Sequence, residues 1–433
     1  MKLILGLGVT GLSVARFFSL HKITYRIADS RLNPPMLDLS RHENLIIDCH
    51  LGAWQESTLN NISEIIISPG IAITEEIVKW ALNRKISIIS DIELFGRYVK
   101  APVIGITGSN GKSTVTQLLG EMALADGVNT VICGNIGEPV MASICEDAEL
   151  YVVELSSYQL DYTHNLELFA GVINNISPDH LDRYSSYDDY IKSKLSIYSY
   201  CKFKVINLEE TLVPISEGDS FYTAGNVDAR CNFSAEKVGA LYEVYYDGNS
   251  IINSDELTVV GRHNLENVLA ALTLGYCFGL TINAMTQAAI NFKGLEHRLE
   301  FVTKKNTIDY FNDSKSTNAI STKTAINALF EKYSNLTLIL GGISKKEDYS
   351  ELFQLINEKV SAVVLIGESS SDFSMKIKIP QEIAKSMKEA VMTAKTITKD
   401  GAVLLSPGCA SFDMFVDFND RGKAFKKHVF EEI

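Results

Sequence analysis

The chain has 433 residues, of which 46% are hydrophobic and 21% are charged, an ordinary composition for a globular protein with ample core material. At about 150 residues for an average domain, this length predicts about three domains. The net charge of −13 argues against a nucleic acid or an anionic membrane surface as partner. An anionic substrate would therefore have to be met by a local cluster of cations and backbone N–H groups.

The first stretch with a chemical signature is a glycine-rich loop near the start of the chain. "KLIL" at 2–5 predicts a strand, "GLGVTG" at 6–11 has the GxGxxG spacing, and "LSVARFFSL" at 12–20 predicts a helix. In this context the glycines let the backbone approach a pyrophosphate at a helix N-terminus. Asp29 ends the next strand-like run, where a ribose-binding acid would lie. Tight packing of a strand on a helix explains the glycines equally well, and an NAD-dependent oxidoreductase is the first rival hypothesis.

The same opening also resembles a short signal peptide. Its basic region holds only Lys2, however, and Arg16 interrupts the apolar run before a convincing cleavage site. The seven cysteines are scattered and form no CxxC pair, which favours reduced thiols over a disulfide framework or a zinc site. We therefore expect a cytoplasmic protein.

A second and stronger phosphate-loop signature lies further along the chain. "PVIGIT" at 102–107 predicts a strand and "VTQLLGEMALADG" at 115–127 a helix, and the "GSNGKST" between them supplies backbone N–H groups, a lysine and hydroxyls. Lys112 would reach the β- and γ-phosphates of a nucleotide, and Ser113 would bind Mg²⁺. The strict GxxxxGK[ST] pattern fails, because Ile106 occupies its first glycine position. The alternative is a tight turn with a surface lysine.

A third cluster follows the next buried strands. "YVVELSSYQL" at 151–160 contains a strand that ends in Glu154, the acid placed near the metal of a P-loop. "NNISPDHLDRYSSYDDYIKSK" then carries His180, Asp182, Lys192 and Lys194. Taken alone, each of these is explained as a loop or helix-surface residue. Their joint presence after a P-loop and after a strand that ends in a glutamate favours a site for ATP and a metal.

Strand-length apolar runs alternate with helical stretches over most of the chain. Runs such as "LTLILGG" at 336–342 and "GAVLLSP" at 401–407 are continuously apolar, as strands covered on both faces are, and they predict mainly parallel sheets. "YEVYYDGNSIIN" at 242–253 instead predicts a hairpin on the edge of the middle domain, with its turn at "DGN". We expect an α/β fold of three domains at residues 1–92, 93–295 and 296–433.

Ten motifs in one order carry a family resemblance: "GLGVTG", "SPG" at 68–70, "GITGSNGKST", "GNIG" at 134–137, "ELSSYQL", "SPDHLDRY", "GRHNLENVLAA", "EHR" at 296–298, "NDSKSTN" at 312–318 and "SPGCASFDMF". With them the chain resembles the Mur ligases over essentially its whole length, and most of all the members that add D-glutamate. The resemblance implies a Rossmann-like N-terminal domain, a P-loop ATPase-like central domain with a mainly parallel sheet, and a Rossmann-like C-terminal domain.

The resemblance also implies an activity. It is the ATP-dependent formation of an amide bond between D-glutamate and UDP-N-acetylmuramoyl-L-alanine, through an acyl phosphate, in cytoplasmic synthesis of peptidoglycan precursors. ATP would lie on the second loop and the uridine diphosphate of the substrate on the first. Two Mg²⁺ ions would take part. The partners would be these small molecules, without nucleic acid or membrane, and we expect a monomer.

Site residues follow from the resemblance by matching motif positions. The UDP-substrate residues are Thr10, Asp29, Ser30, Arg31, Asn135, Ser156 and His180. The ATP residues are Gly108, Ser109, Asn110, Gly111, Lys112, Ser113, Thr114, Asn267, Arg298 and Asp313. The D-glutamate residues are Lys315, Thr317, Lys345, Ser411 and Phe418. The metal ligands are Ser113, Glu154, His180 and Lys194, the last as a carbamate. The catalytic residues are Lys112, His180, Lys194 and Arg298.

Three other hypotheses are weighed against this one. A folylpolyglutamate synthase shares the ATP-binding and C-terminal parts but would not begin with a Rossmann-like nucleotide domain. A Mur ligase specific for another amino acid is closer, and the short N-terminal domain and "SPGCASFDMF" favour D-glutamate over it. An ATP-binding regulatory module would not need Lys315, Thr317 and Ser411. In "GGISKKEDY", Lys345 and Lys346 are adjacent, so that the substrate lysine is either of the two.

Overall fold

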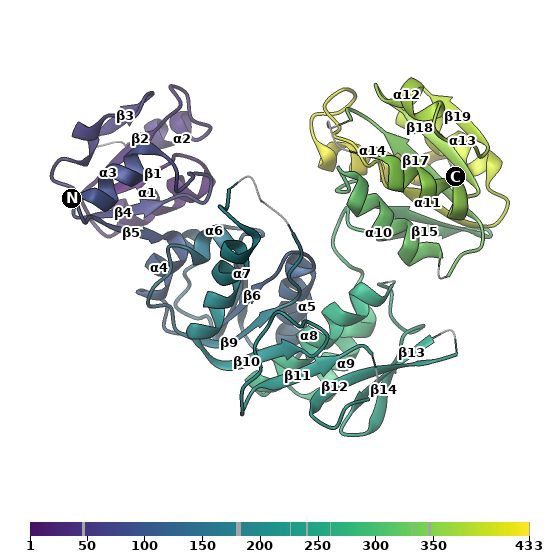
Figure 1. Ribbon diagram of the computed structural model, residues 1–433, viewed down its shortest axis with the longest axis horizontal. Helices are drawn as coiled ribbons and strands as arrows, with labels where there is room; N and C mark the ends of the chain where they lie inside the picture. Colours follow the sequence, from purple (N-terminus) through teal and green to yellow (C-terminus); the bar gives the residue numbers. More distant parts are fainter. Residues whose placement is uncertain are drawn as a thin grey trace. The chain divides into compact units, whose positions relative to one another are not determined.

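The computed structural model describes residues 1–45, 48–178, 183–225, 227–239, 241–259, 261–330, 332–344 and 348–432. Its contacts divide the chain into two compact units, Met1–Ile252 with Glu266–Ala289, and Asn253–Leu265 with Ile290–Ile433. The first unit contains two sheets and the second contains one (Figure 1). Each sheet is built from one of the three segments expected from the sequence, and the domain boundaries themselves stay predictions. None of the described helices is long and apolar enough to span a membrane.

The first sheet is parallel throughout and has the strand order β3-β2-β1-β4-β5. Its strands are β1 (Lys2–Leu5), β2 (Tyr25–Asp29), β3 (Cys49–Leu51), β4 (Glu64–Ile67) and β5 (Ser87–Ser90). Its helices are α1 (Val9–Leu20), α2 (Leu37–His42), the 3₁₀ helix η1 (Glu56–Leu59) and α3 (Glu76–Asn83). This order places β1 at the centre, where the strand order reverses, which is where ligands bind in open α/β sheets.

The second sheet has nine strands in the order β14-β13-β12-β11-β10-β9-β6-β8-β7, and it is parallel from β7 to β12. Its strands are β6 (Val103–Thr107), β7 (Thr130–Gly134), β8 (Leu150–Glu154), β9 (Leu168–Ile173), β10 (Cys201–Asn207), β11 (Ser220–Thr223), β12 (Cys231–Val238), β13 (Leu241–Tyr246) and β14 (Asn249–Asn253). All five residues of β6 and of β8 are buried, as continuous apolarity predicts for strands covered on both faces.

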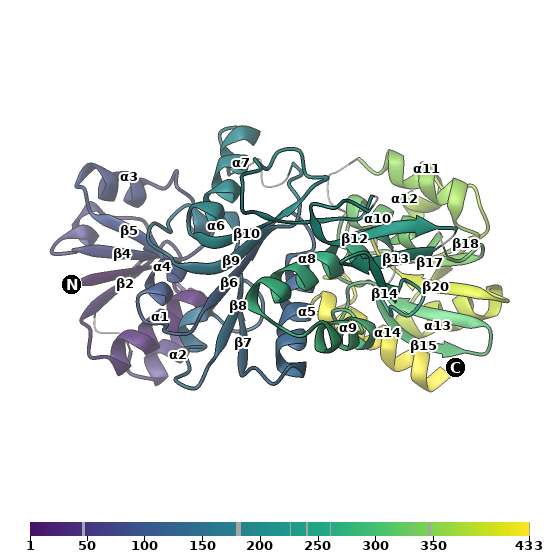
Figure 2. The same cartoon turned by 90° about the horizontal axis from the view of Figure 1, so that it is seen from below.

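Helices cover this sheet, and α5 packs against β6, β7 and β8 (Figure 2). The helical elements of this part of the chain are α5 (Lys112–Ala125), η2 (Val140–Ala142), α6 (Ser157–Leu160), α7 (Tyr187–Leu195), η3 (Ser196–Ser199), α8 (Arg262–Phe278) and α9 (Ile282–Asn291). The predicted hairpin is confirmed as β13 and β14 at one end of the sheet. Asp247 and Gly248 have φ of 48° and 74°. Positive φ at both central residues is the requirement of a type I′ turn, which the "DGN" sequence meets.

The third sheet, in the second unit, has the order β15-β16-β20-β17-β18-β19. Only the pair β15–β16 is antiparallel among the described pairings. The strands are β15 (Glu300–Lys305), β16 (Ile308–Asn312), β17 (Leu336–Gly341), β18 (Ala362–Ile366), β19 (Gln381–Ala384) and β20 (Gly401–Leu405). The helices are α10 (Ala319–Phe330), α11 (Ser350–Lys359), α12 (Ser370–Ser374), α13 (Met387–Ile397) and α14 (Phe418–Glu432). The expected mainly parallel α/β fold is therefore confirmed.

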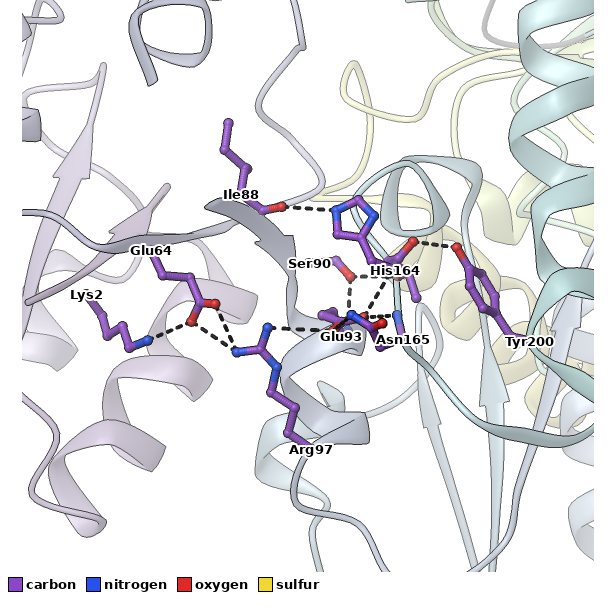
Figure 3. Close-up of polar contacts among 10 residues, drawn as sticks. Lys2, Glu64, Ile88, Ser90, Glu93, Arg97, His164, Asn165 and Tyr200 are labelled. Carbon is purple, nitrogen blue, oxygen red and sulfur yellow. Dashed lines mark hydrogen bonds and ion pairs between the residues drawn. The ribbon is translucent and has the colours of Figure 1, made fainter. Parts of the chain in front are cut away.

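A short helix, α4 (Asp91–Gly96), joins the first sheet to the second within the first unit. Its Glu93 accepts hydrogen bonds from the backbone N–H groups of His164 and Asn165, both at 2.8 Å. Arg97, directly after the helix, pairs with Glu64 of β4 at 3.0 Å and lies 3.6 Å from Glu93 (Figure 3). These contacts connect α4 both to β4 of the first sheet and to the segment that precedes β9 of the second sheet.

Asp91 at the start of this helix is buried, and the Gln159 side-chain amide donates to its carboxyl group at 3.1 Å. Burial raises the pKa of Asp91 from its ordinary value of 3.8 to about 6, and hydrogen bonds from Gln159 and the backbone offset only part of the rise. The folded protein therefore holds a proton that the unfolded chain releases at lower pH. The stability that Asp91 contributes is present below about pH 4 and is lost as the pH rises through about 6.

This pKa predicts the pH dependence of an Asp91→Asn variant. Asparagine keeps an oxygen that accepts from Gln159, but it cannot ionise. From pH 4 to pH 7 the free energy of unfolding of the variant, relative to the parent, should rise by about 2 kcal/mol, since each pKa unit corresponds to about 1.4 kcal/mol and part of the effect is already lost at pH 4. Urea unfolding of both proteins across this range measures the difference. If the difference between the two free energies of unfolding does not change with pH, the raised pKa of Asp91 is contradicted.

Candidate functional site

The first glycine loop connects β1 to α1 in the first unit, and there is little space around its first and last glycines. Gly6 has φ of 96°, and a Cβ on Gly11 would lie 2.0 Å from the Gly6 carbonyl oxygen. Only glycine fits at Gly11, because the start of the helix packs directly on the end of the strand. A Cβ on Gly8 would meet nothing within 4 Å. The middle of the loop is therefore open, and Gly8 is the place where a ligand can approach the backbone.

Asp29 at the end of β2 holds this loop in place. Its buried carboxylate accepts from the Leu7 backbone N–H at 2.8 Å and from the Arg31 side chain at 2.7 and 2.8 Å. Burial alone would raise the pKa of Asp29, but the hydrogen bonds from Arg31 and Leu7 outweigh it and lower the pKa. Ser30 and Arg31 are exposed beside it. Of the residues expected at a UDP site, Asp29 and Arg31 thus lie together at the loop.

The second loop connects β6 to α5. Hydrogen bonds with its own Lys112 and with Asn175 fix its backbone. Lys112 donates from Nζ to the carbonyl oxygens of Gly108 and Ser109, at 2.9 and 3.0 Å. The Ser109 N–H donates to the Asn175 carbonyl and the Asn110 N–H to the Asn175 side chain, both at 2.9 Å. Sequence reasoning missed the role of Asn175, and the "NN" after β9 was its only signal.

Asn267 of α8 lies against the same loop. A Cβ on Gly111, whose φ is 79°, would come within 2.2 Å of the Asn267 side-chain oxygen. Both the backbone conformation and the close contact require glycine at this position. Asn267 was expected at the ATP site, and the structure places it at the edge of the ATP-type loop.

Glu154 at the end of β8 has one carboxylate oxygen that no described residue hydrogen-bonds. Its side chain is buried, and Oε1 accepts from the Asn135 side-chain amide at 2.9 Å. Oε2 is buried and accepts no hydrogen bond from the part of the chain that the structure describes. Because a buried carboxylate oxygen without a hydrogen bond is costly, this oxygen is suited to bind a cation. Ser156, two residues on, caps α6 together with Gln159.

No group of three or more His, Cys, Asp or Glu side chains forms a metal cage among the residues that the structure describes. His180, an expected metal ligand and UDP-substrate residue, lies outside the described residues, as does Lys345 of the expected D-glutamate site. Ser113 is buried at the start of α5. Glu154 and Ser113 are hard oxygen donors of the kind that Mg²⁺ prefers, so the described part of the expected metal site fits that ion.

Helix α7 brings Lys194 and Tyr190 to the second loop. Lys194 is only 2% exposed, and its Nζ donates to the Gly108 carbonyl at 2.8 Å and lies 4.6 Å from the centre of the Tyr190 ring. The Tyr190 hydroxyl is 2.9 Å from Ser109 Oγ. The Lys192 side chain is 76% exposed and lies 3.7 Å from Asp189. Lys194 therefore contacts the phosphate loop, whereas Lys192 of the same helix is exposed.

A second cluster lies in the second unit, around Asp313. Its carboxyl group accepts from Ser406 Oγ at 2.7 Å and from the Leu299 N–H at 3.0 Å. Burial raises the pKa of Asp313 to about 6, and these hydrogen bonds and the nearby charge of Arg298 oppose the rise. The Lys315 ammonium is 5.3 Å from the centre of the Phe418 ring. Arg298 therefore lies near the buried Asp313, and Lys315 lies near Phe418.

Arg421 organises this cluster and was missed by sequence reasoning. It is 1% exposed and donates to Ser314 Oγ, to the Ser314 carbonyl and to the Cys409 carbonyl, at 2.8 to 3.0 Å. Burial lowers the pKa of Arg421 to about 10. Ser314 Oγ in turn donates to the Phe418 carbonyl at 2.8 Å. One side chain of α14 therefore joins the "NDSKSTN" and "SPGCASFDMF" segments.

Comparisons with known proteins assign the chain to a family. Residues 1–90 match the family described as Mur ligase MurD-like, N-terminal domain; residues 106–275 match Mur ligase middle domain; and residues 297–409 match Mur ligase, glutamate ligase domain. A relative from Marinobacter nauticus, named UDP-N-acetylmuramoylalanine--D-glutamate ligase, is 40% identical over 433 residues, covering 99% of this chain and 97% of its own. The chain belongs to the Mur ligase family.

Other members of the family agree with this assignment. Relatives of the same name from Coxiella burnetii and Aliivibrio fischeri are each 39% identical and cover 99% and 98% of this chain, and 98% and 95% of their own lengths. Among solved structures, a pseudomurein peptide ligase type C from Methanothermus fervidus has a TM-score of 0.60 at 18% identity, with both chains fully covered. UDP-N-acetylmuramate-alanine ligase from Thermotoga maritima has a TM-score of 0.60 at 16% identity and covers 100% and 99%. These two likenesses show the fold alone.

Proposed function

We propose that this Mur ligase joins D-glutamate to UDP-N-acetylmuramoyl-L-alanine in an ATP-dependent reaction of peptidoglycan precursor synthesis. The observation that carries the proposal is the full-length identity of 38–40% to relatives named for that ligation. Family membership makes the protein an ATP-dependent ligase that acts on small molecules. We further propose that the protein works in the cytoplasm, because its scattered cysteines favour reduced thiols, and that it works as a monomer.

The two glycine loops serve two molecules under this proposal. The open middle of the first loop, with Thr10, Ser30 and Arg31 beside it, binds the uridine diphosphate, and Asp29 fixes the loop and Arg31. The second loop binds the phosphates of ATP through its backbone N–H groups and Lys112. A dinucleotide fingerprint needs no hydride chemistry in this role, because glycines and a helix N-terminus hold the pyrophosphate of any nucleotide.

The reaction begins with a carboxylate, which is a poor electrophile and has to be activated. The terminal carboxylate of the UDP-substrate attacks the γ-phosphate of ATP, which forms an acyl phosphate and releases ADP. The amine of D-glutamate then attacks the acyl carbon, loses a proton, and phosphate leaves. Lys112 and Arg298 offset the negative charge that gathers on the phosphoryl group. Asn267 and Asp313 would bind the adenosine part of ATP, and Asn135 and Ser156 the muramoyl-alanine part of the substrate.

Two Mg²⁺ ions would supply further positive charge at the phosphates, and the chain offers ligands for them. Ser113 and the unsatisfied Oε2 of Glu154 would hold the first ion. His180 and Lys194 would hold the second, Lys194 as a carbamate. A neutral amine binds Mg²⁺ poorly, whereas a carbamate supplies an anionic oxygen. The carbamate forms when the amine adds to CO₂ and loses a proton, and it keeps one N–H that can still donate to the Gly108 carbonyl.

The D-glutamate site is proposed in the second unit. Lys315, Thr317 and Lys345 would bind the region of the α-carboxylate, and Ser411 and the backbone near Phe418 the side-chain carboxylate. The surroundings support this for Lys315, which is exposed and lies over the Phe418 ring. Arg421 would position the two segments that carry these residues, because it donates to both of them.

The amino-acid specificity can be tested directly. With UDP-N-acetylmuramoyl-L-alanine and ATP, we expect phosphate release with D-glutamate and less than about a hundredth of that rate with L-glutamate, L-lysine or meso-diaminopimelate. A site built to pair with a substrate's polar groups discriminates by such factors, since the wrong amino acid leaves buried groups unpaired. Equal turnover with any of the three would overturn the assignment.

Lys194 and Lys192 form a matched pair for testing the carbamate. Lys194→Ala should lower kcat at least about 100-fold, the usual cost of losing one electrostatic partner of the transferring group. Acetate or formate should restore part of the activity, because a small carboxylate can occupy the space of the carbamate. Lys192→Ala removes an exposed lysine of the same helix and should stay within about twofold of the parent. An unchanged kcat in Lys194→Ala, or a loss that no carboxylate restores, would contradict the role.

A further inference from the structure

A bridge between the two parts of the first unit lies at Arg183, a residue to which the proposed reaction assigns no role. A cavity of about 310 Å³ is lined by Ser68, Pro69 and Ile71, from the loop after β4, and by Tyr158 and Arg183. Arg183 contacts both sides of this lining. It donates from Nη1 to the Pro69 carbonyl at 3.0 Å and from Nη2 to the Ile71 carbonyl at 2.8 Å, and its Cζ lies 3.9 Å from the centre of the Tyr158 ring.

The loop that Arg183 holds supports the first glycine loop. Ser68 Oγ donates to the Gly6 carbonyl at 3.0 Å, and the Ser68 N–H donates to the Leu5 carbonyl at 2.9 Å. A Cβ on Gly6 would lie 2.9 Å from Ser68 Cβ, so that the two loops are in direct contact. A shift of residues 68–71 would therefore move the backbone at Gly6, at the start of the proposed pyrophosphate loop.

On its other side, Arg183 stacks on α6, a helix that is hydrogen-bonded to α7, which contacts the ATP loop. Tyr158 belongs to α6, and the Ser157 carbonyl of the same helix accepts from Ser193 Oγ of α7 at 3.0 Å. Lys194, the next residue, donates to the Gly108 carbonyl. Helix α7 therefore reaches the ATP loop through contacts of its own, which do not depend on the Arg183 side chain.

We propose that Arg183 is a positioning residue that sets the place of the UDP-substrate loop relative to the ATP loop. Only the kinetic effect that we expect from this role rests on the proposed function. Arginine suits it because a planar guanidinium can donate to two carbonyls while it stacks on a ring, whereas a lysine ammonium cannot do both. Arg97, directly after α4, pairs with Glu64 of β4, and Ser90 of β5 is hydrogen-bonded to Thr163 (Figure 3). Because these contacts hold the same two parts together elsewhere, we expect Arg183→Ala to keep the fold.

The first test needs no substrate. Hydrogen exchange should be about tenfold faster at residues 66–73 and 6–8 in Arg183→Ala than in the parent, as expected when charged hydrogen bonds to a loop are lost. Exchange in α5 should stay unchanged. Arg84→Ala is the matched control, because the partners of Arg84 are Glu56 and Asn60, which lie outside residues 66–73. Unchanged exchange at 66–73 would overturn the proposal whatever reaction the protein catalyses.

The second test is kinetic. Arg183→Ala should raise the KM for the UDP-substrate about tenfold and leave the KM for ATP within about twofold, while Arg183→Lys should recover part of the loss. A merely structural role would instead raise both KM values together and lower the melting temperature. Equal changes in both KM values would contradict positioning, and an inactive parent enzyme would contradict the proposed function but not the exchange result.

A double-mutant cycle separates the bridge from each residue alone. Tyr158→Leu removes the ring on which Arg183 rests and should raise the KM for the UDP-substrate as well. If the two side chains act as one bridge, Arg183→Ala/Tyr158→Leu should be no worse than the poorer single variant. If the increases in KM of the two single variants multiply in the double variant, the two side chains contribute independently, which would contradict the proposal that they act as one bridge.

Discussion

Two lysine ammonium groups meet at one backbone carbonyl, that of Gly108, and the chemistry of the first unit depends on this convergence. Lys112 reaches it from the start of α5 and Lys194 from the end of α7. In a chain of net charge −13, the ATP-type loop thus gathers positive charge beside backbone N–H groups. Like charges so placed favour a bound polyanion, or the modification of one lysine, because either removes their repulsion. The proposed ATP site and the proposed carbamate are two consequences of the same electrostatic constraint.

The strands and the two loops were predictable because their signals are local. Continuous apolar runs predicted β1, β6 and β20, and "DGN" predicted the turn between β13 and β14. The glycines at 6, 11 and 111 were marked by spacing, and the structure gives each a steric reason. Glu154 could be found because an acid that ends a buried strand near a P-loop is recognisable without knowing the fold.

The residues that sequence reasoning missed act through contacts distant in the chain. Arg183 acts on carbonyls more than a hundred positions earlier, and Arg421 on segments of two other loops. Arg183 stands in the motif "SPDHLDRY", which assigns it no role, and Arg421 lies outside the ten motifs, so that their partners could be learned only from the fold. Asn175 belongs to the same class. The roles of His180 and Lys345 rest on the family resemblance, because both lie outside the described residues.

The central claim is that the two glycine loops hold two different molecules. Calorimetric binding to Gly8→Val tests it most directly, because Gly8 has φ of −94°, which residues with a side chain adopt, and a Cβ at this position meets no atom within 4 Å. The account predicts that UDP-N-acetylmuramoyl-L-alanine binds at least about tenfold more weakly to the variant, since the side chain fills the place of the pyrophosphate, while ATP affinity stays within about twofold. Equal weakening of ATP, or binding of NADH to the parent protein as tightly as the UDP-substrate, would contradict it.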